Sequence, residues 1–256
     1  MSFGIDHSST PPDPAKLVAA GVHFVCRYLS TPGNPKNLTL AEAAALKLHQ
    51  IDVVLVFETV AKEALKGQAA GVADAKSARQ QAAVCGLPDA PIYFAVDFDE
   101  TPQEASVVHD YVAGAASVLG YDKTGGYGGY WVVKRLLDAK VCKYAWQTYA
   151  WSGGQWDVRA QLRQYLNGQK LAGISVDFDH SMFPDYGQAR PPSPLKDAAV
   201  LKAERGYWAW VQWRLGEDDW AGYTPADPAV RPDVPKLISD SWWVALARFL
   251  AARKKA

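Results

Sequence analysis

Pairs of aspartates follow two apolar segments of this chain. The segment AVDFDE places Asp97 and Asp99 two positions apart, and SVDFDH repeats the pattern with Asp177 and Asp179. Side chains at positions i and i+2 of a β-strand point to the same side, so each pair would present both carboxyls together. Repulsion between neighbouring carboxylates raises the pKa of at least one of them, which suits a general acid. The repeat therefore predicts a site that works by acid–base chemistry.

Two further acids, Asp6 and Glu58, stand at the ends of the apolar segments SFGID and IDVVLVFE. Three interpretations of the acids are open. Paired carboxylates can hydrolyse a glycosidic bond, one as proton donor and the other facing the positive charge that develops. With His7 and His180 they could form a metal site, although the sequence has no HxH or HExxH pattern and we expect no metal or other cofactor. They could also be solvated strand ends, helix caps or ion-pair partners.

The elements that must position these acids alternate along the chain. Helices are expected at 38–50, near 68–85 and at 101–120, where Thr, Glu, Pro and Gly supply start and stop signals. The segment 158–167 is compatible with a strand or a helix. Strand-like segments occupy residues 2–6, 23–29, 51–58, 90–99, 125–132, 143–151, 158–167 and 172–179.

Eight strand candidates that alternate with helices predict an α/β protein with a (β/α)8 TIM-like barrel. In such a barrel the carboxyl ends of the parallel strands open on one face, so the acids would converge there. The barrel segment is shorter than the ~250 residues typical of this fold, so some helices must be short or missing in its later part. An open doubly wound sheet is the alternative, but no GxGxxG sequence follows a strand.

A proline-rich segment, GQARPPSPLKD at 187–197, divides the chain. We expect the barrel to occupy residues 1–187, a linker 188–200 and a Trp-rich, α-helical C-terminal extension 201–256. Within the extension, 201–216 and 239–255 have the apolar spacing of amphipathic helices.

Composition narrows the possible partners. The 256 residues include 27 basic and 27 acidic side chains, a balance that argues against a nucleic acid or an anionic membrane surface as partner. The three cysteines are widely spaced and form no CxxC motif, and Cys26 is expected to be a buried free thiol. No signal-peptide pattern opens the sequence and no apolar run reaches transmembrane length. We therefore expect a chain made in the cytoplasm without a signal peptide and not inserted into a membrane.

Aromatic residues are abundant, with 10 Trp, 12 Tyr and 8 Phe. Aromatic rings stack on sugar faces while their polar atoms bind hydroxyls, so they suit a glycan groove. An inward Gln147 could bind a sugar or fill the barrel, and Arg27, a charge within a strand, is expected to pair with a core acid. The candidate substrate-binding residues are Glu58, Tyr127, Trp146, Gln147 and Trp151.

The order of these motifs resembles a known family. The segments FGID, FVCRYL, LTLAEAAAL, PIYFAVDFD, GGYGGY, YAWQTYAW and VDFD, over about residues 2–185, are similar to the glycoside hydrolase-like domain called domain of unknown function family 1906. That family resembles the family 25 lysozymes, which cleave between N-acetylmuramic acid and N-acetylglucosamine in peptidoglycan. It occurs in actinobacterial proteins and in phage lysins.

The resemblance implies roles for individual residues. Asp6 would be the first-strand carboxylate, Asp177 the last-strand Asp, and Gln147 part of a Trp-Gln element. Asp97 matches the first acid of the lysozymes' Asp-x-Glu motif. Asp99 stands where their catalytic Glu would be and would be the general acid/base, while Asp97 or Asp177 would orient and stabilise a substrate-assisted reaction. An Asp at this position has a side chain one methylene shorter than Glu.

Together, residues and resemblance predict a peptidoglycan-degrading glycoside hydrolase, a muramidase-like endolysin, with Asp6, Asp97, Asp99 and Asp177 as catalytic residues. We expect a monomer that reaches the bacterial cell wall after release or export by another system. The alternatives are a non-catalytic barrel that binds cell-wall glycan and a structural component of a virion or secretion apparatus.

Overall fold

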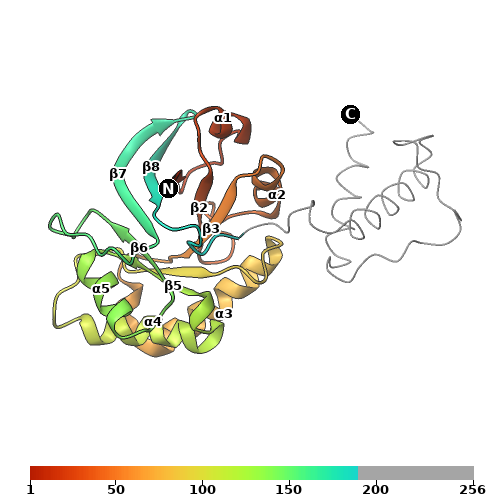
Figure 1. The fold of residues 1–256 in the computed structure, drawn as a ribbon. Coiled ribbons are helices and arrows are strands. Elements are labelled where there is room, and N and C mark those ends of the chain that lie inside the picture. Colours follow the sequence, from red (N-terminus) through yellow and green to blue (C-terminus); the bar gives the residue numbers. More distant parts are fainter. Residues whose placement is uncertain (190–256) are drawn as a thin grey trace, which may run out of the picture. The chain divides into compact units, whose positions relative to one another are not determined.

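The computed structural model describes residues 1–189, which form a closed eight-stranded barrel (Figure 1). This confirms the expected α/β barrel. The proposed extension at 201–256 and nearly all of the proposed linker lie outside the described residues. The strands are β1 Ser2–Asp6, β2 Phe24–Leu29, β3 Asp52–Phe57, β4 Ile92–Ala95, β5 Thr124–Gly128, β6 Tyr144–Thr148, β7 Leu162–Leu171 and β8 Ile174–Ser181.

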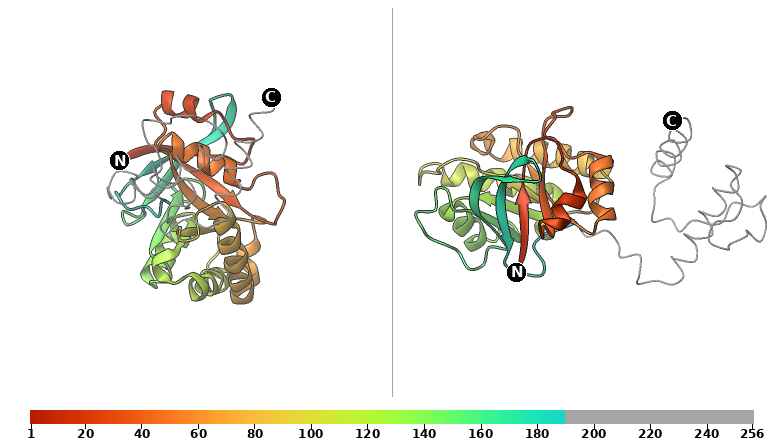
Figure 2. Two further views of the ribbon diagram at one scale, coloured as in Figure 1. Left: turned by 90° about the vertical axis from the view of Figure 1, so that its right-hand side faces the viewer. Right: turned by 90° about the horizontal axis from the view of Figure 1, so that it is seen from above.

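The last strand departs from the expected parallel barrel. Strands β1 to β7 run parallel to their sequential neighbours, but β8 is antiparallel to both β7 and β1. Ala172 and Gly173 alone connect β7 to β8, both with positive φ (51° and 89°), and a two-residue turn of this kind joins antiparallel strands. The red β1 lies beside the blue-green β8 in the right-hand view of Figure 2.

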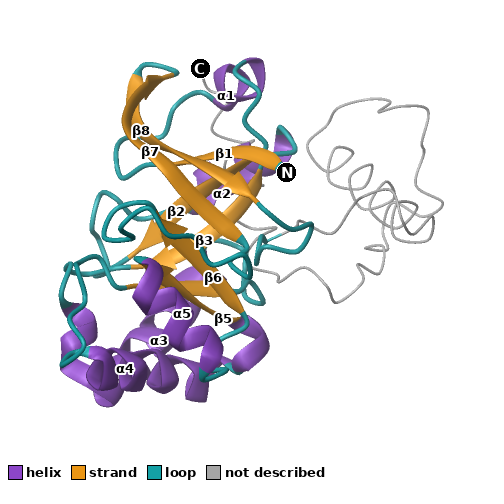
Figure 3. Cartoon of the chain, turned by 60° about the vertical axis from the view of Figure 1, so that its left-hand side comes forward, coloured by secondary structure: helices purple, strands orange, loops and turns teal. Residues whose placement is uncertain are grey.

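Five α-helices cover the barrel within residues 1–189. They are α1 Pro14–Ala19, α2 Leu40–Leu48, α3 Gly67–Val84, α4 Ala105–Leu119 and α5 Tyr130–Asp138, together with the short 3-10 helices η1 Glu63–Lys66 and η2 Tyr121–Lys123. No α-helix separates β6 from β7 or β7 from β8, which agrees with the expected shortage of helices late in the barrel. Figure 3 shows α3, α4 and α5 gathered on one side, away from the β7–β8 hairpin.

Local hydrogen bonds explain where two of the helices begin. Thr39 caps α2, with its Oγ1 accepting the Glu42 amide at 3.2 Å. The helix expected at 101–120 begins only at Ala105, because Thr101 donates from its amide and hydroxyl to the Glu104 carboxylate (2.9 and 2.8 Å) and forms a turn ahead of the helix. The ambiguous segment 158–167 contributes to strand β7. None of the helices within residues 1–189 is long and apolar enough to cross a membrane.

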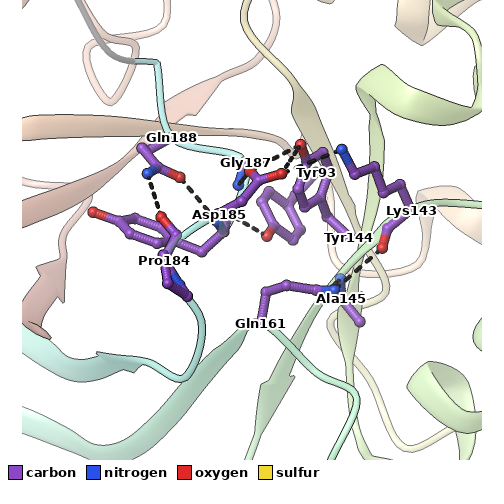
Figure 4. Close-up of polar contacts among 10 residues, drawn as sticks. Tyr93, Lys143, Tyr144, Ala145, Gln161, Pro184, Asp185, Gly187 and Gln188 are labelled. Carbon is purple, nitrogen blue, oxygen red and sulfur yellow. Dashed lines mark hydrogen bonds and ion pairs between the residues drawn. The ribbon is translucent and has the colours of Figure 1, made fainter. Parts of the chain in front are cut away.

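Aromatic side chains fill the N-terminal end of the barrel. Phe24 occupies this end, and a Cβ on the neighbouring Gly4 would lie 2.3 Å from the Phe24 ring, so only glycine fits there. The segment after β8 returns to the same end, where the Tyr93 hydroxyl donates to the Tyr186 carbonyl (2.8 Å) and the Tyr144 hydroxyl to Asp185 (3.0 Å) (Figure 4). The acids lie toward the opposite, C-terminal end.

Candidate active site at the C-terminal end of the barrel

A glutamine connects two of the predicted acids. Asp6 is the last residue of β1 and lies opposite Asp177 on β8. Gln164 Nε2 donates to Asp6 Oδ2 at 2.7 Å and lies 3.4 Å from Asp177 Oδ2, while the Gly168 amide donates to Asp177 Oδ1 at 2.7 Å. The Gln164 Oε1 accepts a hydrogen bond from the Tyr127 hydroxyl at 3.1 Å. The antiparallel β8 thus still brings Asp177 to the C-terminal end of β1.

Asp179 lies one step deeper, opposite Gly4, and is fully buried. Its Oδ1 accepts the Trp146 indole N–H at 2.8 Å. Burial, followed by repulsion from Asp6, raises the pKa of Asp179 well above its usual range, which favours the protonated form of this carboxyl. Asp179 is therefore part of the acid cluster, although the family resemblance implies no role for it.

Asp6 has a strongly perturbed carboxyl. Burial raises its pKa, repulsion from Asp177 raises it further, and hydrogen bonds from Gln164 and Asp179 partly offset both effects, so that the pKa of Asp6 is about 7. The residue is 3% exposed. A carboxyl with this pKa exchanges its proton near neutral pH, which is the range that acid–base catalysis requires.

Asp97 and Glu58 complete the acid cluster. Glu58 directly follows β3, and its Oε1 lies 3.3 Å from Lys36 Nζ. Asp97, two residues beyond β4, is half-buried, and burial followed by the charge of Glu58 raises its pKa; the Asp177 charge adds to the rise and Lys36 opposes it. No described residue donates a hydrogen bond to Asp97, which leaves its carboxyl free to meet a ligand.

Asp99 does not join this cluster. The prediction that Asp97 and Asp99 share a strand face is wrong, because β4 already ends at Ala95 and the chain then turns. Phe98 is buried, Asp99 is exposed, and Glu100 is buried in an ion pair with Arg135. Asp99 forms no hydrogen bond or ion pair with any residue in 1–189.

Aromatic side chains line the interior next to the acids. Tyr127 and Trp146 are buried, with ring centroids 4.7 Å apart. Lys36 Nζ lies over the Tyr28 ring, 4.7 Å from the ring centroid. Burial and the charge of Asp6 raise the pKa values of Tyr28 and Tyr127 well above the usual range for tyrosine, so both hydroxyls remain neutral donors.

Gln147 and Trp151 lie elsewhere. Trp146 occupies the inward position, and strand alternation turns Gln147 outward, so the interpretation of Gln147 as an inward residue is wrong. The Gln147 side chain instead binds the loop between β6 and β7, donating to the Ser152 hydroxyl (3.1 Å) and the Gln155 carbonyl (2.9 Å). Trp151 is 36% exposed within that loop.

Sequence reasoning missed Gln164, Tyr28 and Lys36. Gln164 was hidden because 158–167 was compatible with either a strand or a helix. Assigned as a strand, the order Leu162, Arg163, Gln164 would have placed Gln164 inward beside the buried Leu162. Tyr28 follows the same alternation two residues after Cys26, whereas Lys36 lies in a loop and no sequence pattern indicates its position.

Other expectations about charged and polar groups have clear outcomes. Arg27 is fully buried and pairs with Glu42, as predicted, and its Nη1 also donates to the His7 carbonyl. Cys26, Cys85 and Cys142 are buried free thiols. His180 stacks on Tyr165, with centroids 4.3 Å apart. Among residues 1–189 no three His, Cys, Asp or Glu side chains are grouped so as to hold a metal ion.

Solved structures share this architecture. The Tat-secreted protein Rv2525c of Mycobacterium tuberculosis, solved in complex with L-tartrate, is 26% identical over 73% of this chain and 98% of its own, with a TM-score of 0.69. An uncharacterized protein of B. stearothermophilus is 16% identical over 71% of this chain and 96% of its own, at a TM-score of 0.54. The modular autolysin LytC of Streptococcus pneumoniae is 17% identical over 70% of this chain and 46% of its own, with a TM-score of 0.55. The latter two show the shared fold alone.

A search of curated proteins gives no match. A family model does match, over residues 15–182, and its range includes every acid of the cluster except Asp6. With the closed barrel and the similarity to Rv2525c, this match shows that the chain belongs to the family of the Rv2525c-like, glycoside hydrolase-like domain.

Proposed function

We propose that this barrel hydrolyses bacterial cell-wall glycan, as a muramidase-like enzyme acting on peptidoglycan. The observation that carries the proposal is the convergence of Asp6, Asp97 and Asp177, whose pKa values are all raised, at the C-terminal end of the barrel. Glycoside hydrolysis needs one protonated and one ionised carboxyl beside the scissile bond. The glycoside hydrolase-like family and fold support the same reaction class.

In this proposal Asp97 is the proton donor. Its carboxyl is half-buried, it has a raised pKa, and no protein hydrogen bond competes for it. Asp177 accepts the Gly168 amide, which stabilises its ionised form, and it would face the positive charge on the sugar or orient an N-acetyl group. The buried Asp6 would hold Gln164, and through it Asp177, in position. The family resemblance points to Asp99 as general acid. The carboxyl of Asp99 is exposed, however, whereas that of Asp97 is half-buried and has a raised pKa, so we assign this role to Asp97.

The test is release of reducing ends from purified peptidoglycan by the full chain. Asp97→Asn and Asp177→Asn should each lower kcat by at least about 100-fold, the size of effect associated with one acid–base group. Asp99→Asn, a matched change two residues from Asp97, should leave kcat within about twofold. Loss of activity in Asp99→Asn with retention in Asp97→Asn would transfer the acid role to Asp99.

A non-catalytic barrel that binds the same glycan is the second candidate. The exposed Asp99, at the position where the resembling lysozymes have their catalytic Glu, favours it. This candidate predicts a protein that sediments with cell walls but releases no reducing ends from any wall preparation. LytC, which has the same fold, was solved with a synthetic peptidoglycan ligand. We therefore choose peptidoglycan as the first probe.

We further propose that the protein acts at the cell wall, outside the cytoplasm, as a monomer. The relative Rv2525c is a Tat-secreted protein, which supports an extracytoplasmic site of action. Fractionation of producing cells tests the location, since a protein found entirely in the cytoplasm would contradict it.

A further inference from the structure

Exposed aromatic side chains follow the C-terminal ends of two neighbouring strands, β5 and β6. Trp131, in the first turn of α5, is 47% exposed, and Tyr149 and Trp151, just after β6, are 51% and 36% exposed. These three residues and the partly exposed Tyr130 are called the rim aromatics. The same strands place Tyr127 and Trp146 next to the acid cluster, so the rim aromatics stand at the end of the barrel that carries the acids.

A hydrogen bond and close packing join the two segments that contain the rim aromatics. The Tyr130 amide donates to the Ser152 hydroxyl at 3.0 Å, which links the start of α5 to the loop after β6. Trp151 packs directly over Gly129, where an added Cβ would lie 2.9 Å from the Trp151 carbonyl oxygen and 3.0 Å from its Cβ. Only glycine at 129 permits this approach, so the rim aromatics belong to one packed unit.

Buried hydrogen bonds hold the loop in one conformation. Gln147 is 1% exposed and uses both ends of its amide, donating to Ser152 Oγ and the Gln155 carbonyl and accepting the Asp157 amide at 2.9 Å. The Ser152 hydroxyl donates in turn to the Thr148 carbonyl at 2.6 Å. A satisfied buried network of this kind makes a loop rigid.

Trp151 itself has a left-handed backbone, with φ of 55°. A large side chain rarely adopts this conformation, and it persists only where its surroundings impose it. Strained residues of this kind cluster at ligand sites. The Gln147 network therefore holds Trp151 in a fixed and unfavourable position at the rim while leaving a third of the residue in solvent.

The four rim rings differ in their ring and cation contacts. Arg135 lies over the Trp131 ring, with its Cζ 5.6 Å from the centroid, and Tyr130 packs edge-on against Trp131. No described ring or cation stacks on Trp151 or Tyr149. A rigid, exposed Trp with an N–H at its edge is suited to a sugar, whose C–H face stacks on the ring while its hydroxyls meet polar atoms.

We propose that the rim aromatics, with Trp151 at their centre, form a second sugar subsite that binds a pyranose ring of the glycan chain beyond the acid cluster. The inference rests on the proposed function, because it takes the occupant to be another unit of the same glycan. The subsite lengthens the stretch of glycan that is bound without touching the reacting bond. Gln147 acts in it as a positioning residue for the Trp151 loop.

Binding to two probes tests the subsite: purified peptidoglycan, by sedimentation, and a soluble N-acetylglucosamine oligomer, by titration. Both measurements use the full chain carrying Asp97→Asn, so that turnover does not consume the probe. Trp151→Asn removes the ring, and Asn tolerates the left-handed backbone. Affinity should fall by about tenfold, as for a central binding residue.

Tyr121→Ala is the matched control, because Tyr121 is 47% exposed but lies before β5, at the N-terminal end of the barrel. This variant should bind as the parent does. Gln147→Glu keeps the side-chain size but removes the amide donor, and should weaken binding while Trp151 is still present. A thermal melt of each variant checks that the barrel remains folded.

The outcomes separate this inference from the proposed function. Unchanged affinity in a folded Trp151→Asn variant, or no binding of the parent to either probe, would overturn the subsite. Binding that depends on Trp151, together with no release of reducing ends by the chain with Asp97 intact, would overturn hydrolysis and keep the subsite. Release of reducing ends by the chain with Asp97 intact, together with glycan binding that does not depend on Trp151, would overturn the subsite and keep hydrolysis.

Discussion

Asp6 and Asp179 lie on adjacent strands inside the barrel, where two ionised carboxylates would repel each other at low dielectric. The raised pKa of Asp179 favours its protonated form and so reduces this repulsion, and the Trp146 indole N–H donates to Asp179 Oδ1. Asp6 accepts a hydrogen bond from the Gln164 side-chain amide, which also lies close to the Asp177 carboxyl. The buried pair therefore determines where the more accessible Asp177 carboxyl lies, and proton binding in the interior is coupled to the geometry at the mouth.

This coupling predicts a pH dependence of stability. The pKa of Asp6 rises from 3.8 to about 7 on folding, so the folded state binds this proton more tightly than the unfolded state does. The resulting stabilisation is complete below about pH 4 and is lost as the pH rises through about 7. The unfolding free energy of the wild type, minus that of Asp6→Asn, should fall across this window in urea titrations.

The prediction concerns the difference in unfolding free energy between the wild type and Asp6→Asn, because the titration of His7 changes stability in the opposite direction. Burial and then the Arg27 charge lower the pKa of His7 from 6.5 to about 4, so its contribution to stability increases over the same pH range. His7 is present in both proteins and its effect cancels. Asp99→Asn serves as the control substitution, because Asp99 is exposed and lies outside the acid cluster. A pH-independent difference between wild type and Asp6→Asn would refute the assigned shift.

How well individual residues could be predicted depended on whether their strand was recognised to its true end. Asp6, Asp97 and Asp177 were found because apolar runs end at or beside them. Asp99 was placed wrongly because an i and i+2 pair shares a face only while the strand continues, and no local pattern marked its end at Ala95. Gln164 was missed because its segment has no clear apolar period.

At the scale of elements, the β7–β8 hairpin determines the direction of the last strand. An all-parallel barrel would have needed a crossover helix before β8, and the chain has room only for Ala172 and Gly173. The pair Ala-Gly is a weak turn signal compared with Asn-Gly, so the alternation of strands and helices earlier in the chain favoured one more parallel strand. Helix capping, by contrast, is local, and α2, capped by Thr39, lies within the range 38–50 that was expected for it.

Two opposite substitutions test this turn. Gly173 has φ of 89°, so Gly173→Ala should lower the unfolding free energy by about 1 kcal/mol or more, since alanine is strained there. Ala172 has φ of 51°, and Ala172→Gly should relieve strain and change stability by no more than about 1 kcal/mol. Equal destabilisation by both changes in urea melts would contradict the assigned turn geometry.

At the scale of the whole described barrel, the two ends have different roles. The N-terminal end is filled by Phe24, Tyr93 and Tyr186, and the hydroxyl of Tyr186 donates to Asp52 at 3.0 Å. The Ala189 amide adds a hydrogen bond to the Val53 carbonyl at 2.7 Å. The C-terminal end instead gathers acids whose mutual repulsion opposes folding. Packing at one end thus offsets electrostatic strain at the other, an arrangement that no single sequence motif encodes.

This division predicts that stability and activity can be changed separately. Tyr186→Phe removes one hydrogen bond and leaves Asp52 without the hydroxyl that it accepts, so the unfolding free energy should fall by about 1–3 kcal/mol. Because Tyr186 lies at the N-terminal end of the barrel, kcat/KM on peptidoglycan should stay within about twofold of the wild-type value below the melting temperature.

Asp97→Asn should give the reverse result, with activity lost and stability maintained or increased, because removing one charge relieves the repulsion from Glu58 and Asp177. Thermal melts and reducing-end assays on both variants measure the two quantities, and a large activity loss in Tyr186→Phe would show that the two ends are coupled.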